Sequence, residues 1–182
     1  MGKILIHLAD GFEEIEAIAP IDILRRGGCD VVTVSVMGRK EVTSSRGVTV
    51  IADTLYAENL YADADMLVLP GGMPGTKNLK DHKGLCEMLL NANQSGKWIA
   101  AICAAPTILG SLGLLKGKRA TCFPGMEDEL IGAIVTGSYV EQDGKIITAK
   151  GAGVATDFGF TLLKCIKDEK TALDVKSKMQ FP

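Results

Sequence analysis

The sequence contains few aromatic residues, few histidines and no long apolar run. Aromatic residues make up 5% of the 182 residues, and the histidines are His7 and His82. No apolar stretch approaches the roughly 18 residues that span a bilayer, and the N-terminal stretch MGKILIHLADG is too short and too polar for a signal peptide. We therefore expect a cytoplasmic protein without a membrane partner.

The spacing of the cysteines and the balance of charge exclude further classes of protein. The five cysteines are widely separated and form no CxxC motif, so neither a structural zinc site nor a disulfide framework is indicated. The formal net charge is −2, and lysine and arginine are spread along the chain instead of forming a basic patch. We expect no metal, no nucleic-acid partner, and structural thiols at Cys29, Cys86, Cys122 and Cys165.

The apolar pattern predicts strands that alternate with helices. Hydrophobic residues make up 47% of the chain and glycine contributes 21 residues, which suits an α/β domain with tight turns. Apolar runs predict strands at 3–9, 30–36, 65–70, 97–103 and 118–124. Apolar residues at helical spacing, with caps and breakers at the ends, predict helices at 13–26, 82–95, 105–113, 154–167 and 169–179.

Two hairpins and one proline complete this pattern. Residues 47–53 are predicted to pair with residues 41–44, and DG within residues 138–150 predicts a second hairpin. Pro20 predicts a kink or a break in the helix over 13–26. Alternating strands and helices predict a mostly parallel central sheet with helices on both faces. No linker or repeat interrupts the chain, so we expect one domain over residues 1–182.

Sheets of this kind bind ligands beyond the carboxyl ends of their strands, which selects three loops. These loops are DGFEE after the first strand, PGGMPG after LVL, and CAAP after WIAAI. Cys103 lies where a strand becomes a helix, so we expect unpaired amides and the helix dipole to lower the pKa of its thiol. The amides of Gly71, Gly72 and Ala104 are candidates for binding an oxyanion.

Three acids, Glu13, Glu14 and Glu16, follow the first loop. Glu16 lies one helical turn after Glu13, whereas Glu14 points elsewhere, and an acid near the thiol is a candidate proton shuttle. Each feature also has a structural interpretation. A cysteine after a buried strand is often a packing residue, a GG pair is often a tight turn, and acids in a first helical turn often serve the dipole. The three features together favour a site.

Several motifs resemble the ThiJ/PfpI superfamily, and within it the branch of the parkinsonism-associated deglycase and its bacterial relatives. The motifs are AICAAP at 101–106, LPGGMPG at 69–75, DGFEEIEAIAPIDILRRGG at 10–28, SSRGV at 44–48 and TAKGAGVATDFGF at 148–160. The resemblance spans nearly the whole chain, and the spacings agree. It implies a flavodoxin-like three-layer sandwich and a homodimer.

The resemblance also implies roles for individual residues. Cys103 corresponds to a reactive cysteine that is readily oxidised to sulfinic acid, and Glu16, third in the EExE run, corresponds to its acid partner. The oxyanion amides correspond to Gly72 and Ala104. Arg46 corresponds to an arginine near the site and the dimer contact, although on the sequence alone it is equally an ordinary loop arginine. No cofactor is implied.

Two positions depart from the patterns of this superfamily. Protease-like members carry histidine directly after the cysteine, where this chain has Ala104, so a Cys-His peptidase is not favoured. The deglycase branch often carries histidine before a proline in the segment equivalent to TCFP, where this chain has Phe123. We expect His7 to be a packed core residue and His82 to be solvated, and neither replaces the missing histidine. Cys122, next to that position, is expected to be structural.

Two functional hypotheses follow. The first is a cysteine-dependent, cofactor-independent glyoxalase or deglycase that acts on methylglyoxal, glyoxal or their early protein adducts. The second is a redox sensor or oxidation-dependent chaperone of the stress response, in which Cys103 is oxidised and Glu16 stabilises the sulfinate. Thiamine-precursor biosynthesis, which gave some superfamily members their names, is not supported because the chain has no P-loop signature.

Overall fold

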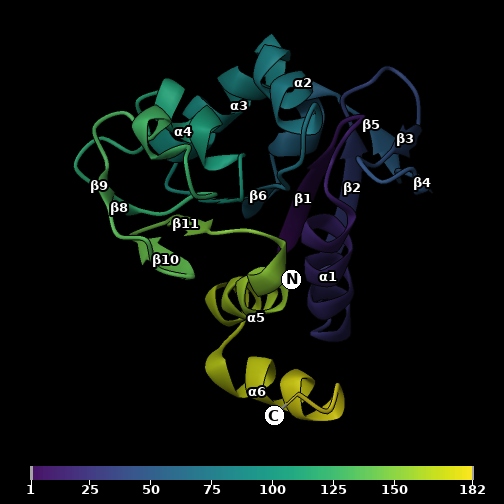
Figure 1. Ribbon diagram of the computed structural model, residues 1–182. Coiled ribbons are helices and arrows are strands. Elements are labelled where there is room, and N and C mark those ends of the chain that lie inside the picture. The colour runs from purple at the N-terminus through teal and green to yellow at the C-terminus, as the bar shows by residue number, and fades with distance from the viewer. Residues whose placement is uncertain (1, 182) are drawn as a thin grey trace.

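Seven strands form the central sheet of the computed structural model, which describes residues 2–181 (Figure 1). Their order is β10-β11-β7-β6-β1-β2-β5, and all neighbours are parallel except the β10–β11 hairpin. The strands are β1 (Lys3–Leu8), β2 (Asp30–Ser35), β5 (Thr54–Leu55), β6 (Met66–Leu69), β7 (Trp98–Ile102), β10 (Val140–Asp143) and β11 (Ile146–Ala149). The predicted mostly parallel sheet is confirmed.

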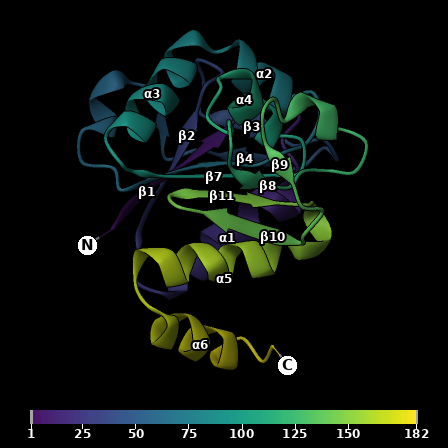
Figure 2. The ribbon, with the colours of Figure 1, turned by 90° about the vertical axis from the view of Figure 1, so that its left-hand side faces the viewer.

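Helices cover both faces of this sheet. The helices are α1 (Glu14–Arg26), α2 (Gly75–Asp81), α3 (Lys83–Gln94), α4 (Pro106–Ser111), α5 (Ala155–Ile166) and α6 (Glu169–Lys178). Helices α1 and α5 lie on one face, and α2, α3 and α4 lie on the other (Figure 1). Figure 2 shows the layers edge-on, with α6 beyond α5. The flavodoxin-like three-layer sandwich is therefore confirmed.

Short elements occupy the edges of the sandwich. Strands β3 (Glu41–Thr43) and β4 (Thr49–Ile51) form the predicted hairpin, and β8 (Arg119–Ala120) pairs in parallel with β9 (Ile134–Val135). The 3₁₀ helices are η1 (Glu58–Tyr61), η2 (Glu127–Glu129) and η3 (Ala152–Val154). Within residues 2–181, no helix combines the length and the apolar character that crossing a bilayer requires.

Alternation along β1 divides the core into two layers. Ile4, Ile6 and Leu8 belong to the cluster that contains Phe158 of α5, while Leu5 belongs to the cluster between the sheet and α2–α4. Successive side chains of a strand point to opposite faces, so both sets are buried at once. Burial on both faces explains why the inner strands have continuous apolar sequences.

Four local expectations differ from the structure. The strand expected over 118–124 is limited to β8, since the next amide, of Thr121, donates to the side chain of Thr148 and not to a main-chain carbonyl. Helix α2 was not predicted because it directly follows the PGGMPG turn. The helix expected at 105–113 ends at Ser111. Helix α1 continues through Pro20, which is buried against α5, so the predicted break is wrong.

His7 connects β1 to β6 and η1. Its ring is fully buried, and Nδ1 lies 3.2 Å from the Val68 carbonyl oxygen while Nε2 lies 2.7 Å from the Tyr61 hydroxyl. A carbonyl only accepts, so Nδ1 carries the proton and Tyr61 donates to Nε2. Burial lowers the pKa of His7 to about 4, which keeps the ring neutral at pH 7. The expected core role of His7 is confirmed.

Candidate functional site

Three loops meet at the carboxyl edge of neighbouring strands. They follow β1, β6 and β7, which are adjacent in the sheet. The Glu13 N–H donates to the Gly71 carbonyl at 2.9 Å, which joins the first loop to the second. Cys103 follows β7 directly and lies beside both loops. The structure therefore brings together the three loops that the sequence selected.

The backbone of Cys103 adopts a left-handed conformation, with φ of 65°. Residues with a Cβ rarely adopt this region, and such strain clusters at functional sites. Two hydrogen bonds hold it: the Cys103 N–H donates to Ala149 O at 2.9 Å, and the Cys103 carbonyl accepts from Phe123 N–H at 2.8 Å. These bonds fix the residue between the end of β11 and the segment that follows β8.

Glu16 reaches the cysteine from the first turn of α1. Glu13 caps this helix, because its carboxylate accepts from the Glu16 N–H at 2.8 Å. The Glu16 side chain is only 1% exposed, and its Oε2 accepts from the Gly71 N–H at 2.9 Å. Glu16 Oε2 and Cys103 Cβ both lie within 2.7 Å of the point that a Cβ on Gly71 would occupy, so the carboxyl group is a neighbour of the cysteine. The Cys103 thiol and the Ala152 N–H both lower the pKa of this carboxyl group. A buried acid thus lies beside the cysteine.

Burial raises the pKa of both members of this pair. For Glu16 the pKa rises to about 7, although its hydrogen bond with Cys103 and the Gly71 and Ala152 N–H groups offset part of the shift. For Cys103 the pKa rises to about 12, through burial first and then through the charge and hydrogen bond of Glu16. The Ala104 and Gly72 N–H groups lower the pKa of the thiol and offset part of this rise.

The expectation that a helix lowers the thiol pKa is therefore wrong. Helix α4 begins at Pro106, three positions after the cysteine, and it is only six residues long. A short helix has a weak dipole, and that effect falls off within the first turn. The buried carboxylate beside the sulfur is closer and has the larger effect. The sequence could not show this, because it did not fix the distance between Glu16 and Cys103.

The two glycines after β6 have different roles. The Gly71 N–H donates to Glu16, so the expectation that it binds an oxyanion is replaced by a role in orienting the acid. A Cβ on Gly71 would lie 2.6 Å from Glu16 Oε2 and 2.7 Å from Cys103 Cβ, so a side chain does not fit. Gly72 has φ of 90°, and its N–H, like that of Ala104, lowers the pKa of the Cys103 thiol. These two amides remain oxyanion candidates.

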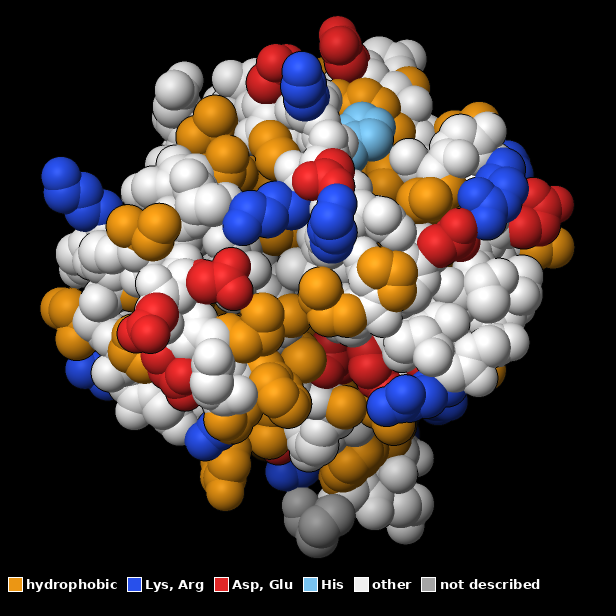
Figure 3. Space-filling view, turned by 45° about the horizontal axis from the view of Figure 1, so that its top comes forward, with side chains coloured by type: hydrophobic (Ala, Val, Ile, Leu, Met, Phe, Trp, Pro, Cys, Tyr) orange, Lys and Arg blue, Asp and Glu red, His pale blue; other side chains and the backbone are white. Residues whose placement is uncertain are grey.

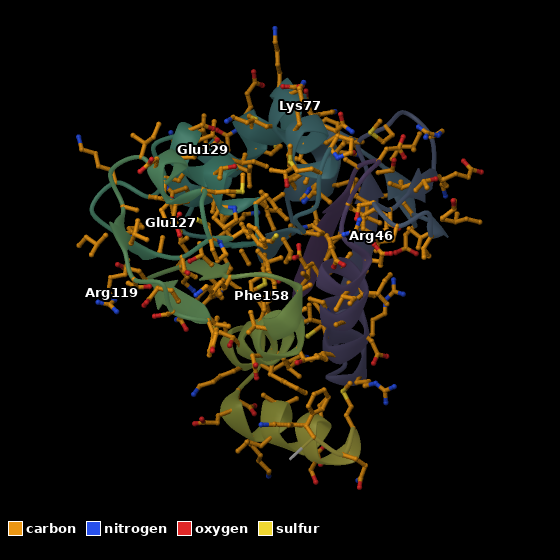
Figure 4. The ribbon with its side chains drawn as sticks, in the orientation of Figure 1. Arg46, Lys77, Arg119, Glu127, Glu129 and Phe158 are labelled. Atoms are coloured by element: carbon orange, nitrogen blue, oxygen red, sulfur yellow. The ribbon has the colours of Figure 1, made fainter. Side chains whose placement is uncertain are left out.

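A cavity of about 600 Å³ opens at the sulfur. Its polar lining side chains are Glu13, Glu16, Ser45 and Arg46. Figure 4 shows Arg46 beside the β3–β4 hairpin, away from the β8–β9 region. Arg46 is exposed, and it forms no ion pair within the part of the chain that the structure describes. The expected proximity of Arg46 to the site is thus observed, while its role remains a proposal.

Large apolar side chains also line the cavity. They are Met73, Phe123, Pro124 and Met126, and Ala104 lines it as well. Figure 3 shows acidic side chains recessed among hydrophobic ones near the middle of this face. The site therefore combines a thiol, an acid and two backbone amides with these four apolar side chains, which together form an apolar wall. Among residues 2–181, no group of three His, Cys, Asp or Glu side chains converges as metal ligands do.

The remaining thiols and the second histidine lie away from the cavity. Cys29 and Cys122 are buried, and Cys122 donates to the Phe123 carbonyl. Cys86 and Cys165 are only partly buried. His82 is also partly buried, because it caps α3 and packs on Tyr56 with ring centroids 4.4 Å apart.

Sequence reasoning missed three groups that hold the site. The Ala152 N–H lowers the pKa of Glu16, and the backbones of Ala149 and Phe123 hold Cys103. All three act through main-chain atoms, which any residue type supplies. Ala149 and Ala152 lie within the TAKGAGVATDFGF motif, which was the available signal for them.

Cys103, in left-handed backbone, lies beside an acid from the first turn of α1, and the family to which the sequence belongs shares these segments. The sequence profile of the DJ-1/PfpI family matches residues 2–165. The chain belongs to the DJ-1/PfpI family. The match covers the loops after β1, β6 and β7, and it also covers η3.

Individual DJ-1/PfpI relatives agree with this assignment. The chain is 40% identical to protein DJ-1 homolog B of Arabidopsis thaliana over 97% of its own length, but it spans only 41% of that relative. It is 35% identical to a protein of Pyrococcus abyssi named a deglycase, with coverage of 83% of this chain and 91% of the relative. The structure of oxidized Toxoplasma gondii DJ-1 superimposes with a TM-score of 0.94 at 36% identity, covering 100% of this chain and 99% of that chain.

Proposed function

We propose that this protein is a cysteine-dependent, cofactor-independent enzyme of the glyoxalase or deglycase type. Its substrates would be methylglyoxal, glyoxal or their early protein adducts. The observation that carries the proposal is that the buried Glu16 carboxyl lies beside Cys103 in one cavity, which Gly72 and Ala104 also line. The archaeal relative named a deglycase supports the same class of reaction.

The first step uses the shared proton of the pair. A proton moves from the Cys103 thiol to Glu16, and the thiolate attacks the aldehyde carbon of the substrate. The carbon–sulfur bond forms, and the carbonyl electron pair moves to oxygen, where the Gly72 and Ala104 amides donate to it. Glu16 then gives its proton to this oxygen and becomes a carboxylate again, so the product of this step is a neutral hemithioacetal.

The later steps move hydrogen between the two substrate carbons. Glu16 as carboxylate removes the proton from the former aldehyde carbon and returns it to the former ketone carbon, which gives a thioester of a 2-hydroxy acid. Water then cleaves the carbon–sulfur bond and restores the thiol. The aldehyde is oxidised and the ketone is reduced within one molecule, so no external oxidant or cofactor takes part. Methylglyoxal and water give lactate.

The test follows lactate formation from methylglyoxal. We expect turnover by the natural protein and a loss of about 100-fold or more in Cys103→Ser and Glu16→Ala, because each removes a group that handles the proton. Cys86→Ser serves as the matched control and keeps full turnover. If the Glu16→Ala variant works as well as the natural protein, the proposed mechanism fails.

The alternative function is a redox sensor or an oxidation-dependent chaperone. It is favoured by the similarity to a DJ-1 whose structure is described as oxidized, and by the acid that lies beside Cys103. A protonated Glu16 can donate a hydrogen bond to a sulfinate oxygen. Absence of turnover, together with the mass of a sulfinate on Cys103 after mild peroxide treatment, would support the sensor over the enzyme.

A further inference from the structure

The apolar wall of the cavity is exposed although it consists of large side chains. Met73 is 57% exposed and Phe123 is 49% exposed, and both line the cavity together with Pro124, Met126 and Cys103. Contiguous apolar surface is unfavourable in water and commonly marks a place where a ligand binds. Because Cys103 lines the same cavity, part of a substrate held at the sulfur can cover this wall.

The cavity is also much larger than methylglyoxal requires. Its volume is about 600 Å³, and liquid water takes about 30 Å³ per molecule, so the cavity has room for roughly twenty waters. Cavities of several hundred Å³ typically hold ligands with a ring or a branched chain. Methylglyoxal carries one methyl group and would leave most of the wall in contact with water.

Backbone hydrogen bonds hold Phe123 in a defined position relative to the sulfur. Its N–H donates to Cys103 O at 2.8 Å, and its carbonyl accepts from the Met126 N–H at 3.2 Å. Upstream, the Thr121 N–H donates to Thr148 Oγ1 at 3.0 Å, which ties the segment to β11. A wall that is fixed before binding loses little conformational freedom when a substrate packs on it.

We propose that the preferred substrates are 2-oxoaldehydes with an aryl or branched alkyl group on the ketone carbon, and that Phe123 determines this preference. The inference rests on the proposed function and names the substrate class of the same site. The charged or ionisable lining residues are Glu13, Glu16 and Arg46, so an apolar group in the cavity finds its large apolar contacts at Phe123, Pro124, Met73 and Met126.

The chemistry is unchanged by the larger group. The Cys103 thiolate forms a bond to the aldehyde carbon, and the aryl or alkyl group on the neighbouring carbon extends into the cavity. The aldehyde is oxidised, the ketone is reduced, and water releases the thioester. One 2-oxoaldehyde and one water give one 2-hydroxy acid, so phenylglyoxal gives mandelate without another reactant.

The first experiment compares kcat/KM for phenylglyoxal and for methylglyoxal, measured as initial rates. The ratio of the two values is taken for the natural protein and for Phe123→Ala, because the comparison cancels the intrinsic reactivities. We expect the ratio to fall by about 10-fold or more in Phe123→Ala. Most of the loss lies in the KM for phenylglyoxal, since wall contacts act in the ground state and the transition state alike.

Two further variants exclude a general disturbance. Phe123→Tyr retains an aromatic ring and keeps the ratio within about 3-fold of the natural value. Tyr139→Ala truncates another exposed aromatic residue, outside the cavity, and leaves both rates unchanged. A ratio that is the same in Phe123→Ala as in the natural protein overturns the inference while the proposed function stands.

A binding measurement separates the two proposals if neither aldehyde is consumed. Calorimetry with mandelate and lactate tests the wall without turnover. Tighter binding of mandelate, lost by about 10-fold in Phe123→Ala, would support the inference even though the proposed reaction had failed. Equal binding of the two acids, or mandelate binding that ignores Phe123, would overturn it.

Discussion

Glu16 and Cys103 behave as one titrating unit. The pKa of the acid is raised to about 7 and that of the thiol to about 12, so the pair carries two protons at low pH and one proton between these values. In the singly protonated pair, the proton can reside on sulfur or on the carboxyl group. The reactive form, with a thiolate next to a protonated acid, exists only after the first proton has left.

This coupling predicts the pH dependence of thiol reactivity. Alkylation of Cys103 by iodoacetamide should accelerate as pH rises through about 7, because the first proton leaves the pair there. In Glu16→Gln the step near 7 disappears. The pKa of the thiol then falls below about 12, because the neighbouring negative charge is gone. Mass spectrometry of alkylated Cys103 over a pH series measures both effects.

Glu14→Gln is the matched control for this prediction. Glu14 belongs to the same helix but does not line the cavity. We expect it to keep the inflection near pH 7. An inflection that survives in Glu16→Gln would show that another group controls the thiol.

At the scale of elements, the inner strands were predictable and the short ones were not. Strands β6 and β7 are buried on both faces, so their sequences are continuously apolar and are readily identified. Strands β8 and β9 have two residues each and lie outside the main sheet. Two residues are too few to show the alternation of apolar and polar side chains that identifies a strand. Helix α2 begins directly after a turn rich in proline and glycine, so the sequence carried no clear signal for its first residue.

The candidate site was predictable in its parts but not in its electrostatics. Cys103, Glu16 and Gly72 followed from the motifs and from the rule on strand ends. The left-handed backbone of Cys103 had no sequence signal, because glycine is the usual marker of that region. The pKa shifts depend on burial and on a contact between residues 87 positions apart, which only the folded chain defines.

The His7–Tyr61 pair predicts how the junction of β1, β6 and η1 responds to acid. The native pKa of His7 is about 4 and the reference value is 6.5, so below about pH 6.5 the unfolded state takes up the proton first. The resulting loss of unfolding free energy, complete near pH 4, is about 3 kcal/mol. We expect urea unfolding over a pH series to show it.

Variants of the pair isolate this contribution. The double variant His7→Leu with Tyr61→Phe removes the titrating ring and its partner, and we expect its pH slope to be shallower than that of the natural protein. Tyr61→Phe alone leaves the buried Nε2 of His7 without a donor, and we expect it to lower the free energy of unfolding by about 1–3 kcal/mol at pH 7. Equal slopes in the natural protein and the double variant would contradict the assignment.

At the scale of the whole molecule, α1 and the β3–β4 hairpin present an apolar surface. Ile15, Ile18 and Val48 are exposed there. Glu14 lies at the same surface, and its buried Oε2 has no hydrogen-bond partner within residues 2–181. A second copy of the chain would cover the apolar residues and lie next to Arg46. Homodimerisation through this surface is our proposal.

Sedimentation velocity tests the assembly. We expect the natural protein to have twice the mass of the chain and Ile18→Asp to have the mass of one chain, because a charge in the contact is costly to bury. Leu173→Asp, on the exposed side of α6, is the matched control and remains a dimer. A natural protein that sediments as a single chain refutes the proposal.

Position 123 serves two purposes through two different parts of one residue. Its main-chain N–H helps to hold the nucleophile, while its ring forms part of the wall. Any amino acid except proline can supply that N–H. A substitution at position 123 can therefore change the wall that a substrate contacts, while the main-chain bond that holds Cys103 stays in place.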